Sequence, residues 1–532
     1  MIKSMEMFDI IVKDGLLIDG SGKKGEVTDV GIKGDRIKAI RNLNGYKAER
    51  IINAEGLVVS PGFIDSHSHS EFTILADSRA KSKVMQGVTT EINGNCGLSA
   101  APLIGESREQ REGDLKEFGI KERWTTFNDY FSILERRGLG LNFATLVGHG
   151  NIRASVIGYN DRHSSKEEMR KMMVLLEDAL KDGAVGISTG LCYPPGVYSS
   201  IEEIIGLSMI LPKYCGIFTS HIRNEGERLL ESVDEVIRVG KEAETPVHIS
   251  HLKTSGEKNW SKIDTLFNLI DGARKEGVDV TCDRYPYTAS STDLDAIFPS
   301  WTYEGGVEEE FKRLKSSKVR GKIKKEILQN HPERDYWEKV LVSSLSSQKN
   351  KWMEGKSLSY ISNQINKDPV DALFYILMEE RLRVSAIFFS MNEENLKRVI
   401  KKPYTMIGSD SSARSNNGIT ARGKPHPRGF GTFPRVLGRY VREEGILTLE
   451  EAIYKMTGFT SRRYGIKSRG LISEDYYADI TVFDPGRIND RSIFDNPFLY
   501  PDGIVYVIVN GIPVVEDGEL KGTLPGMVLK NG

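Results

Sequence analysis

Two histidines separated by a single residue mark a candidate metal site. His67 and His69 follow the apolar run Pro-Gly-Phe-Ile at residues 61–64. In an extended strand, residues i and i+2 point to the same side, so both imidazoles would face one centre. Neutral imidazole is a common metal ligand. For this pair alone, packing or hydrogen bonding of two buried histidines is an equally good interpretation.

Other residues able to bind a metal also end strand-like runs. They are Cys96, His221, His251 and Asp410. In a barrel of parallel strands, the residues that follow the strands line the active site. Each residue alone fits a core position, but the set favours a metal centre. The histidines at positions 149, 163, 248, 331 and 426 are interpreted as structural.

With these residues in place, the chain resembles the D-aminoacylase (N-acyl-D-amino-acid deacylase) family of the amidohydrolase superfamily. The resemblance covers nearly the full length. It rests on the ordered motifs Pro-Gly-Phe-Ile-Asp-Ser-His-Ser-His (61–69), Gln-Gly-Val-Thr-Thr (86–90), Gly-Asn-Cys-Gly (94–97), Tyr-Pro-Pro-Gly (193–196), His-Ile-Arg-Asn-Glu-Gly (221–226), Ser-His-Leu-Lys (250–253), Asp-Arg-Tyr-Pro-Tyr-Thr-Ala-Ser-Ser-Thr (283–292), Gly-Ser-Asp (408–410) and His-Pro-Arg-Gly-Phe-Gly-Thr-Phe-Pro-Arg (426–435).

This resemblance implies a zinc enzyme that hydrolyses the amide bond of N-acyl-D-amino acids, giving a carboxylate and a free D-amino acid. It implies one tightly bound Zn²⁺ and a position for a second. The implied residues are Cys96, His221 and His251 for zinc, His67 and His69 for the second position, Asp410 for catalysis, and Lys253, Tyr285 and Arg428 for the substrate's α-carboxylate.

The residue types suit that reaction. Zinc lowers the pKa of bound water from about 15.7 towards about 7 and polarises a carbonyl. Asp410 would accept the proton of that water and pass it to the leaving nitrogen. A thiolate is a soft zinc ligand, which suits Cys96 for a bridging position between two metals. Many members of the wider superfamily bridge with a carboxylated lysine on the fourth strand, but the equivalent run, residues 184–190, contains no lysine.

Two other functions fit parts of the pattern. A cyclic amidohydrolase of hydantoinase or dihydropyrimidinase type shares the barrel and the His-x-His motif, but Gly-Asn-Cys-Gly and the missing lysine argue against it. A barrel that has lost its ligands and serves as a scaffold is disfavoured, because every expected ligand is present. Assaying an N-acetyl-D-amino acid beside a hydantoin separates the first alternative, and zinc analysis separates the second.

The middle of the chain alternates strand-like and helix-like stretches. Strands are expected at residues 142–147, 184–188, 216–221, 246–251 and 278–282, and helices at 166–182, 228–244 and 262–276. Repeated strand–helix units argue for a parallel sheet. The number and length of these units predict an α/β fold with a distorted (β/α)8 TIM-like barrel over residues 62–477. Residues 288–400 lack the rhythm and are expected to form an insertion within the barrel.

The two ends of the chain are both rich in short strands. Residues 8–12 and 16–18 flank the turn residues 13–15, and residues 30–32 and 36–40 flank 33–35, which predicts a small antiparallel sheet. Further strands are expected at 479–483, 504–509 and 512–515. We therefore expect a small β-sandwich domain formed by both termini, residues 1–61 plus 478–532.

Composition excludes several classes of protein. Lys and Arg total 73 against 74 Asp and Glu, a net charge of −1, so there is no global basic field for nucleic acid. No window approaches the roughly 18 apolar residues of a membrane span. Four cysteines are too few and too scattered for a disulfide framework. The first twelve residues lack the long apolar core of a secretory signal, so a cytoplasmic enzyme acting on a small molecule is expected, with its oligomeric state left open.

Overall fold

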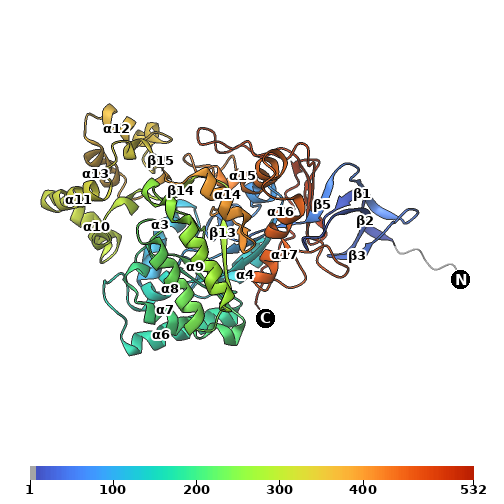
Figure 1. Cartoon of the computed structure of the whole chain (residues 1–532), viewed down its shortest axis with the longest axis horizontal. Coiled ribbons are helices and arrows are strands. Elements are labelled where there is room, and N and C mark those ends of the chain that lie inside the picture. Colours follow the sequence, from blue (N-terminus) through green and yellow to red (C-terminus); the bar gives the residue numbers. More distant parts are fainter. Residues whose placement is uncertain (1–6, 532) are drawn as a thin grey trace.

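Two groups of parallel strands occupy the middle of the chain in the computed structural model, which describes residues 7–531 (Figure 1). In the first group, β7 (Val88–Asn93) lies between β6 (Phe63–Asp65) and β8 (Asn142–Thr145). The second group runs in the spatial order β9 (Val147–Gly148), β10 (Gly186–Gly190), β11 (Ile217–His221), β12 (Val247–Ile249), β13 (Val280–Arg284) and β17 (Thr405–Ile407). All neighbours in both groups are parallel.

The two groups meet on both sides. One residue, Leu146, separates β8 from β9, and its amide donates to the carbonyl oxygen of Asn93 at 2.8 Å. On the other side, beyond the ends of β17 and β6, the amide of Asp410 donates to the carbonyl oxygen of His67 at 2.8 Å. Ser68 and Ser411 form a parallel bridge there. The carboxyl ends of these strands therefore share one edge.

The predicted helices are confirmed, and the strands that follow them start later than predicted. α6 (Lys166–Asp182) begins at a capping box on Ser165 and ends at Gly183, whereas α8 (Leu229–Glu242) and α9 (Ile263–Lys275) are slightly shorter than expected. β10 and β13 begin at Gly186 and Val280, two residues after the predicted starts. The amides of Ala184 and Val278 still donate to the last turn of the preceding helix, at 3.1 and 3.0 Å. Ala184 and Val278, which the pattern predicted as the first residues of strands, therefore take part in the hydrogen bonds that end the helices.

One sheet contains strands from both ends of the chain. Its spatial order is β21 (Glu519–Leu520), β20 (Ile512–Glu516), β19 (Ile504–Val509), β18 (Ile480–Phe483), β5 (Val58–Pro61), β1 (Phe8–Leu17), β2 (Glu26–Lys33) and β3 (Arg36–Ile40), with β4 (Ala48–Asn53) also paired to β1. The antiparallel pair β5–β18 joins the two ends, and Figure 1 shows this sheet at one end of the molecule.

Two predictions about this sheet are wrong. Residues 13–15 do not form a turn, because β1 continues through them and only its register with β2 shifts between Val12 and Gly15. Asp14 adopts a φ of +59° there, and its amide donates to Asp29 at 2.9 Å. An extra residue absorbed as a bulge gives the same sequence signal as a tight turn. The sheet is also mixed rather than antiparallel, since β1 pairs in parallel with β4 and β5.

Residues between β13 and β17 form a separate lobe. The antiparallel strands β14 (Ala289–Asp293), β16 (Ser385–Phe389) and β15 (Val340–Ser344) accompany the helices α10 (Val307–Lys315), α11 (Ser317–Asn330), α12 (Leu358–Gln364) and α13 (Pro369–Glu379). Buried side chains such as Trp337, Leu373 and Phe374 give this lobe a hydrophobic cluster of its own. In Figure 1 the lobe lies at the end opposite the terminal sheet.

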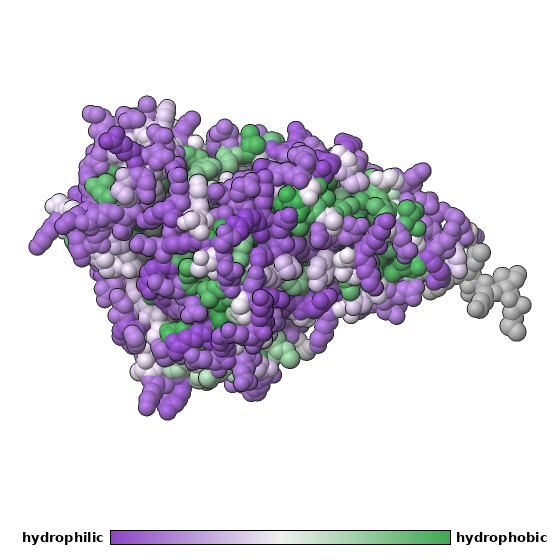
Figure 2. Space-filling view, viewed as in Figure 1, coloured by the Kyte–Doolittle hydropathy of each residue, from purple (hydrophilic) through white to green (hydrophobic). Residues whose placement is uncertain are grey.

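The surface is mainly hydrophilic on the face that Figure 2 shows, with hydrophobic residues gathered towards the terminal sheet. Exposed apolar side chains of that sheet include Val27 (70% exposed) and Ile51 (58%). Among residues 7–531, no helix combines the length and the apolar character needed to cross a membrane.

Candidate metal centre

The structure brings all six predicted metal-centre residues together at the carboxyl edge of the parallel strands. The residues are His67 and His69 after β6, Cys96 after β7, His221 at the end of β11, His251 after β12 and Asp410 after β17. Their ligand atoms form two groups, each with all atoms within 4.8 Å of one another. One group is His67, His69, Cys96 and Asp410, and the other is Cys96, His221 and His251.

Cys96 belongs to both groups. Its Sγ lies 3.3 Å from Nε2 of His67 and 3.5 Å from Nε2 of His251. On the far side of the first group, Oδ1 of Asp410 lies 3.1 Å from Nε2 of His69 and 3.5 Å from Nε2 of His67. A thiolate has the lone pairs to bridge two metal ions, so this position suits the shared ligand.

The backbone carries strain at three of these residues. Cys96, His251 and Asp410 have φ values of +55°, +37° and +49°, in the left-handed region that L-residues seldom adopt. Two residues before Cys96 the backbone passes close to its neighbour, because a Cβ at Gly94 would lie 2.0 Å from the carbonyl oxygen of Leu146. Such strain persists only where the surrounding structure imposes it, and it concentrates at functional sites. The prediction that residues 250–251 continue the strand is therefore wrong, since β12 ends at Ile249.

The donor atoms fit zinc. Burial lowers the pKa of His221 and of His251, which keeps both imidazoles in the neutral form that binds metals. Burial, together with the charge of Asp410, raises the pKa of the Cys96 thiol well above its ordinary value, so a cation is needed to stabilise the thiolate. The buried Nδ1 of His221 has no hydrogen-bond partner among the described residues. Two imidazoles and a thiolate form a donor set that zinc prefers.

Asp283 orients the histidines from behind, a role that sequence reasoning missed. Its Oδ2 accepts hydrogen bonds from Nδ1 of His67 at 3.0 Å and from Nε2 of His248 at 2.8 Å. The bond from Nδ1 leaves Nε2 of His67 free to face the metal group, as in carboxylate–histidine–metal arrangements. Oδ1 of Asp283 also accepts from the amide of His251 at 3.0 Å. His248, for which the sequence predicts a structural role, therefore helps to hold Asp283 in place. The sequence signal for Asp283 is its position as the first residue of the motif at 283–292.

Two of the three predicted carboxylate-binding residues, Arg428 and Lys253, lie over the aromatic ring of the third, Tyr285. The guanidinium carbon of Arg428 lies 4.5 Å from the ring centre of Tyr285, and Nζ of Lys253 lies 5.8 Å from it. The buried hydroxyl of Tyr285 has no hydrogen-bond partner among the described residues. Arg428 also pairs with Asp410 at 2.8 Å, which ties this group to the metal ligands.

Glu225 joins this group and was also missed. Its carboxylate pairs with Lys253 and lies 3.0 Å from Nδ1 of His251. Glu225 therefore neutralises Lys253, which leaves Arg428 as the cation nearer to Asp410. The sequence signal for Glu225 is its place in the motif His-Ile-Arg-Asn-Glu-Gly, four residues after His221. Glu225 lies in the loop that follows β11.

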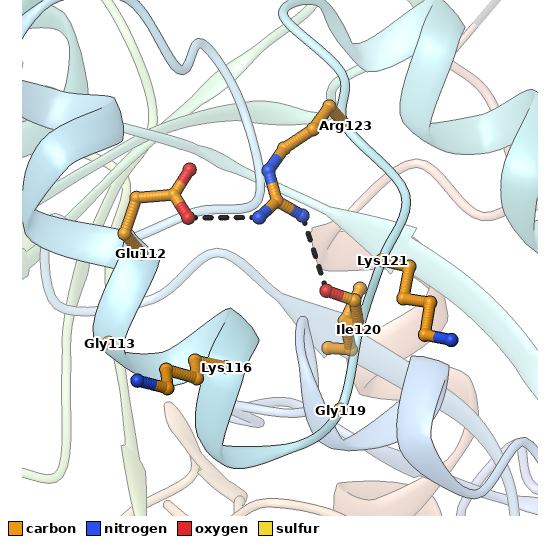
Figure 3. Close-up of a pocket in the computed structure, with 7 residues that line it drawn as sticks. All are labelled: Glu112, Gly113, Lys116, Gly119, Ile120, Lys121 and Arg123. Atoms are coloured by element: carbon orange, nitrogen blue, oxygen red, sulfur yellow. Dashed lines mark hydrogen bonds and ion pairs between the residues drawn. The ribbon is translucent and has the colours of Figure 1, made fainter.

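A surface depression near α3 (Glu106–Glu117) is a separate feature. Figure 3 shows that Arg123 spans it, pairing with Glu112 and bonding to the carbonyl oxygen of Ile120. Lys116 and Lys121 also line it, but no predicted site residue does.

Histidines, a cysteine and a carboxylate at the carboxyl ends of parallel strands define the class of metal-dependent hydrolases with a barrel-like catalytic domain. The amidohydrolase family model matches residues 50–290 and 370–515. A D-aminoacylase of Alcaligenes xylosoxydans xylosoxydans is 36% identical over 524 residues, covering 98% of this chain and 97% of the relative. The chain therefore belongs to the amidohydrolase family, and within it to the D-aminoacylases (N-acyl-D-amino-acid deacylases).

Solved structures agree with this placement. A D-aminoacylase described by its binuclear metal centre, with activation by one metal and attenuation by a second, superposes with a TM-score of 0.83 at 35% identity, covering 98% of this chain and 100% of the other. The N-acyl-D-glutamate deacylase of Bordetella bronchiseptica, complexed with zinc and a phosphonate inhibitor, also gives 0.83, at 32% identity over 99% of this chain and 100% of its own.

The hydantoinase alternative is more distant. The D-hydantoinase of Thermus sp. covers 98% of this chain at a TM-score of 0.56 and 15% identity, which shows a shared fold alone. In addition, β10, the strand after β9, has the sequence Gly-Ile-Ser-Thr-Gly and carries no lysine that could be carboxylated.

Proposed function

We propose that this chain hydrolyses the amide bond of N-acyl-D-amino acids with zinc held at the two donor groups, releasing a carboxylate and a free D-amino acid. The observation that carries the proposal is the placement of Asp410. Its carboxylate lies among His67 and His69 on one side and pairs with Arg428 on the other. One residue thus touches both the metal ligands and the cation that would bind substrate.

The metal assignment follows from the donor sets. Cys96, His221 and His251 would hold the tightly bound zinc, and His67, His69 and Asp410 would share Cys96 at a second position. Zinc bound there would lower the pKa of water to about 7 and polarise the scissile carbonyl.

Asp410 moves the proton. Burial would raise the pKa of its carboxyl, but the interactions that oppose burial, of which the charge of Arg428 is the largest, hold that pKa well below its ordinary value. The group is therefore a carboxylate before reaction and can accept a proton from the attacking water. It then returns the proton to the departing amide nitrogen, which would otherwise leave as a poor anion.

Arg428, Tyr285 and Lys253 hold the other end of the substrate. A free D-amino acid product has its carboxylate next to the scissile nitrogen, and a guanidinium binds carboxylates through two parallel hydrogen bonds. The unpartnered hydroxyl of Tyr285 supplies a further donor. Because Arg428 touches Asp410 directly, a carboxylate bound there places the neighbouring nitrogen beside the proton carrier.

The domain division is part of the proposal. We assign residues 62–477 to a distorted (β/α)8 barrel and residues 1–61 plus 478–532 to a small β-sandwich domain, of which residues 1–6 and 532 lie outside the described range. The β5–β18 pair and the hydrogen bond between Asp410 and His67, which follow β17 and β6, support this division. Residues 288–400 would be the insertion, in keeping with the separate core of that lobe and the gap in the family match. Cytoplasmic location and the absence of nucleic-acid and membrane partners remain predictions.

A substrate panel with metal quantification tests the function. Purified chain is assayed with N-acetyl derivatives of neutral and acidic D-amino acids, their L-enantiomers and a hydantoin, before and after chelation and zinc addition. We expect turnover of at least one D-substrate, lost on chelation and restored by zinc. Ring opening of the hydantoin without hydrolysis of any N-acetyl-D-amino acid would favour the cyclic amidohydrolase instead.

A further inference from the structure

A fully buried lysine lies beneath the metal centre, outside every role assigned above. Lys83, on the short helix α2 (Lys81–Val84), has a side chain with no solvent exposure. Five oxygen atoms surround its Nζ: Oδ2 of Asp65 at 2.7 Å, and Oε1 of Glu91, Oγ of Ser68, Oγ of Ser409 and the carbonyl oxygen of Ser411, each at 2.9 Å. Asp65 and Glu91 are fully buried as well.

These contacts lie on both sides of Asp410. Ser409 and Ser411 are its chain neighbours, and Asp410 itself has the left-handed φ of +49°. Oδ1 of Asp65 accepts from the amide of Ser409 at 2.8 Å, and the carbonyl oxygen of Ser411 also accepts from the amide of His69 at 3.3 Å. Hydrogen bonds to Lys83 and Asp65 therefore hold the residues on both sides of Asp410 in place.

Asp65 and Lys83 also hold His67 and the residue between the two histidines in place. The amide of His67 donates to Oδ1 of Asp65 at 3.2 Å, and Ser68, between the histidines, contacts Nζ of Lys83. Glu91 belongs to β7, the strand that leads to Cys96. Lys83 thus joins β6, β7 and the end of β17, the segments that carry the donor group of His67, His69, Cys96 and Asp410. It contacts neither His221 nor His251.

Electrostatics keep the lysine charged. Burial alone would lower the pKa of Lys83, but the adjacent carboxylates of Asp65 and Glu91 outweigh it and raise that pKa. Hydrogen bonds are stronger in the low-dielectric interior, so a buried ammonium between two carboxylates forms a rigid network.

We propose that Lys83 is a positioning residue, which holds Asp410 in its left-handed conformation and in register with His67 and His69, so that these side chains form the second metal position and present the catalytic carboxylate. This inference rests on the proposed function for its kinetic consequence, but its metal-binding consequence is independent of substrate.

A matched control exists in the same chain. Lys455, on α16 (Leu449–Met456), is also buried and donates to the carbonyl oxygens of Lys402 and Thr405 at 2.5 and 3.1 Å. Thr405 begins β17, so Lys455 supports the amino end of the strand whose carboxyl end Lys83 supports. If replacing a buried lysine acted only through a general loss of packing, the substitutions at Lys83 and Lys455 would have similar effects.

The experiment compares Lys83→Met with Lys455→Met and wild type. Zinc is titrated into chelator-treated protein and both affinities are measured, followed by kcat and KM on the best substrate. For Lys83→Met we expect the weaker zinc affinity and kcat each to fall roughly 10- to 100-fold, the range seen for residues that orient metal ligands, with the tighter affinity and KM within about threefold of wild type. Lys455→Met should leave all four values near wild type.

If Lys83→Met does not fold, as judged by circular dichroism, the double variant Lys83→Met with Glu91→Gln replaces it. That variant keeps the net charge of the cluster at −1, because one cation and one of two carboxylates are removed together. Unchanged second-site affinity in the folded variant, an equal loss in Lys455→Met, or uptake of a single zinc by wild type would overturn the proposal. Absence of turnover in wild type, with the predicted change in zinc affinity, would instead overturn the proposed function alone.

Discussion

The two edges of the parallel strands are built differently. At the carboxyl edge, ionisable side chains are buried together and three of them, Cys96, His251 and Asp410, have left-handed backbone conformations. At the amino edge, the backbone near the start of β8 is paired with the backbone of the C-terminal segment. The C-terminal segment runs beside the start of β8, where the amide of Gly526 donates to Leu139 at 2.7 Å and the amide of Phe143 donates to Met527 at 2.8 Å.

This difference separates function from stability along one set of strands. Strain and buried charge oppose folding and are retained where chemistry needs them. Satisfied backbone hydrogen bonds at the other edge contribute modest stability, about 1 kcal/mol each. Substitutions at the carboxyl edge should therefore change catalysis or metal binding, and changes at the amino edge should alter stability alone.

The largest effect is expected from Asp410→Asn. The amide cannot accept the proton from water, so kcat should fall about 10²- to 10⁴-fold, the range of general acid–base catalysis. The thermal midpoint should stay within a few degrees of wild type, because the shape of the side chain is kept. Activity near that of wild type would remove Asp410 from the mechanism.

Next in size is Cys96→Ala, which deletes the ligand common to both donor groups. Zinc retained after dialysis should fall below one atom per chain, since the tighter group keeps only two imidazoles. Elemental analysis beside wild type measures this. Cys215→Ala, at an exposed cysteine, is the control and should keep the wild-type zinc content.

Arg428→Ala should act mainly on substrate binding. Loss of a charged hydrogen-bonding partner, about 1.5–3 kcal/mol, corresponds to a rise in KM of roughly 10- to 100-fold. Because Arg428 also pairs with Asp410, kcat should fall as well. The fall in kcat should be smaller than the rise in KM. Steady-state kinetics of Arg428→Ala and Arg428→Lys measure both constants. A change confined to kcat would contradict a role of Arg428 in substrate binding.

At the amino edge, ending the chain after Pro525 should lower stability without changing catalysis. The truncation removes four backbone hydrogen bonds, three that Gly526, Met527 and Leu529 make with residues 139 and 143 and one that Asn531 makes with Gly183. Their loss should cost about 4 kcal/mol. Differential scanning calorimetry should show a lower thermal midpoint, while kcat/KM at 25 °C stays within about twofold. A large loss of kcat/KM would mean that the two edges are coupled.

The smallest effect concerns pH. Burial lowers the pKa of Lys455 in the folded chain from 10.5 to about 8. Between these two pH values the unfolded chain binds more protons than the folded chain, so stability from this residue rises with pH through that window. Unfolding in urea at pH 8 and 10 should show this increase in wild type and a smaller one in Lys455→Met. An equal increase in both would show that Lys455 does not titrate in this way.

Much of the site was predictable because its residues stand in short motifs after apolar runs. His67 and His69 follow the apolar run at residues 61–64, whose ends lie within two residues of those of β6, and Cys96 follows β7. Lys83 gave no such signal, because a lysine on a one-turn helix is exposed in most proteins. Glu225 and Asp283 lay inside recognised motifs, but their partners lie on other strands.

The sequence by itself determined the residue types of the metal centre, the edge at which they gather and the strand–helix order that brings them there, because periodicity and turn signals are local. Only the tertiary structure decided which groups neutralise one another. Asp65 accepts a hydrogen bond from the amide of Ser409, 344 residues away in the sequence, and Lys83 donates to both side chains. Such pairs depend on the closing of β17 against β6, and no local pattern records which side chains that closure buries together.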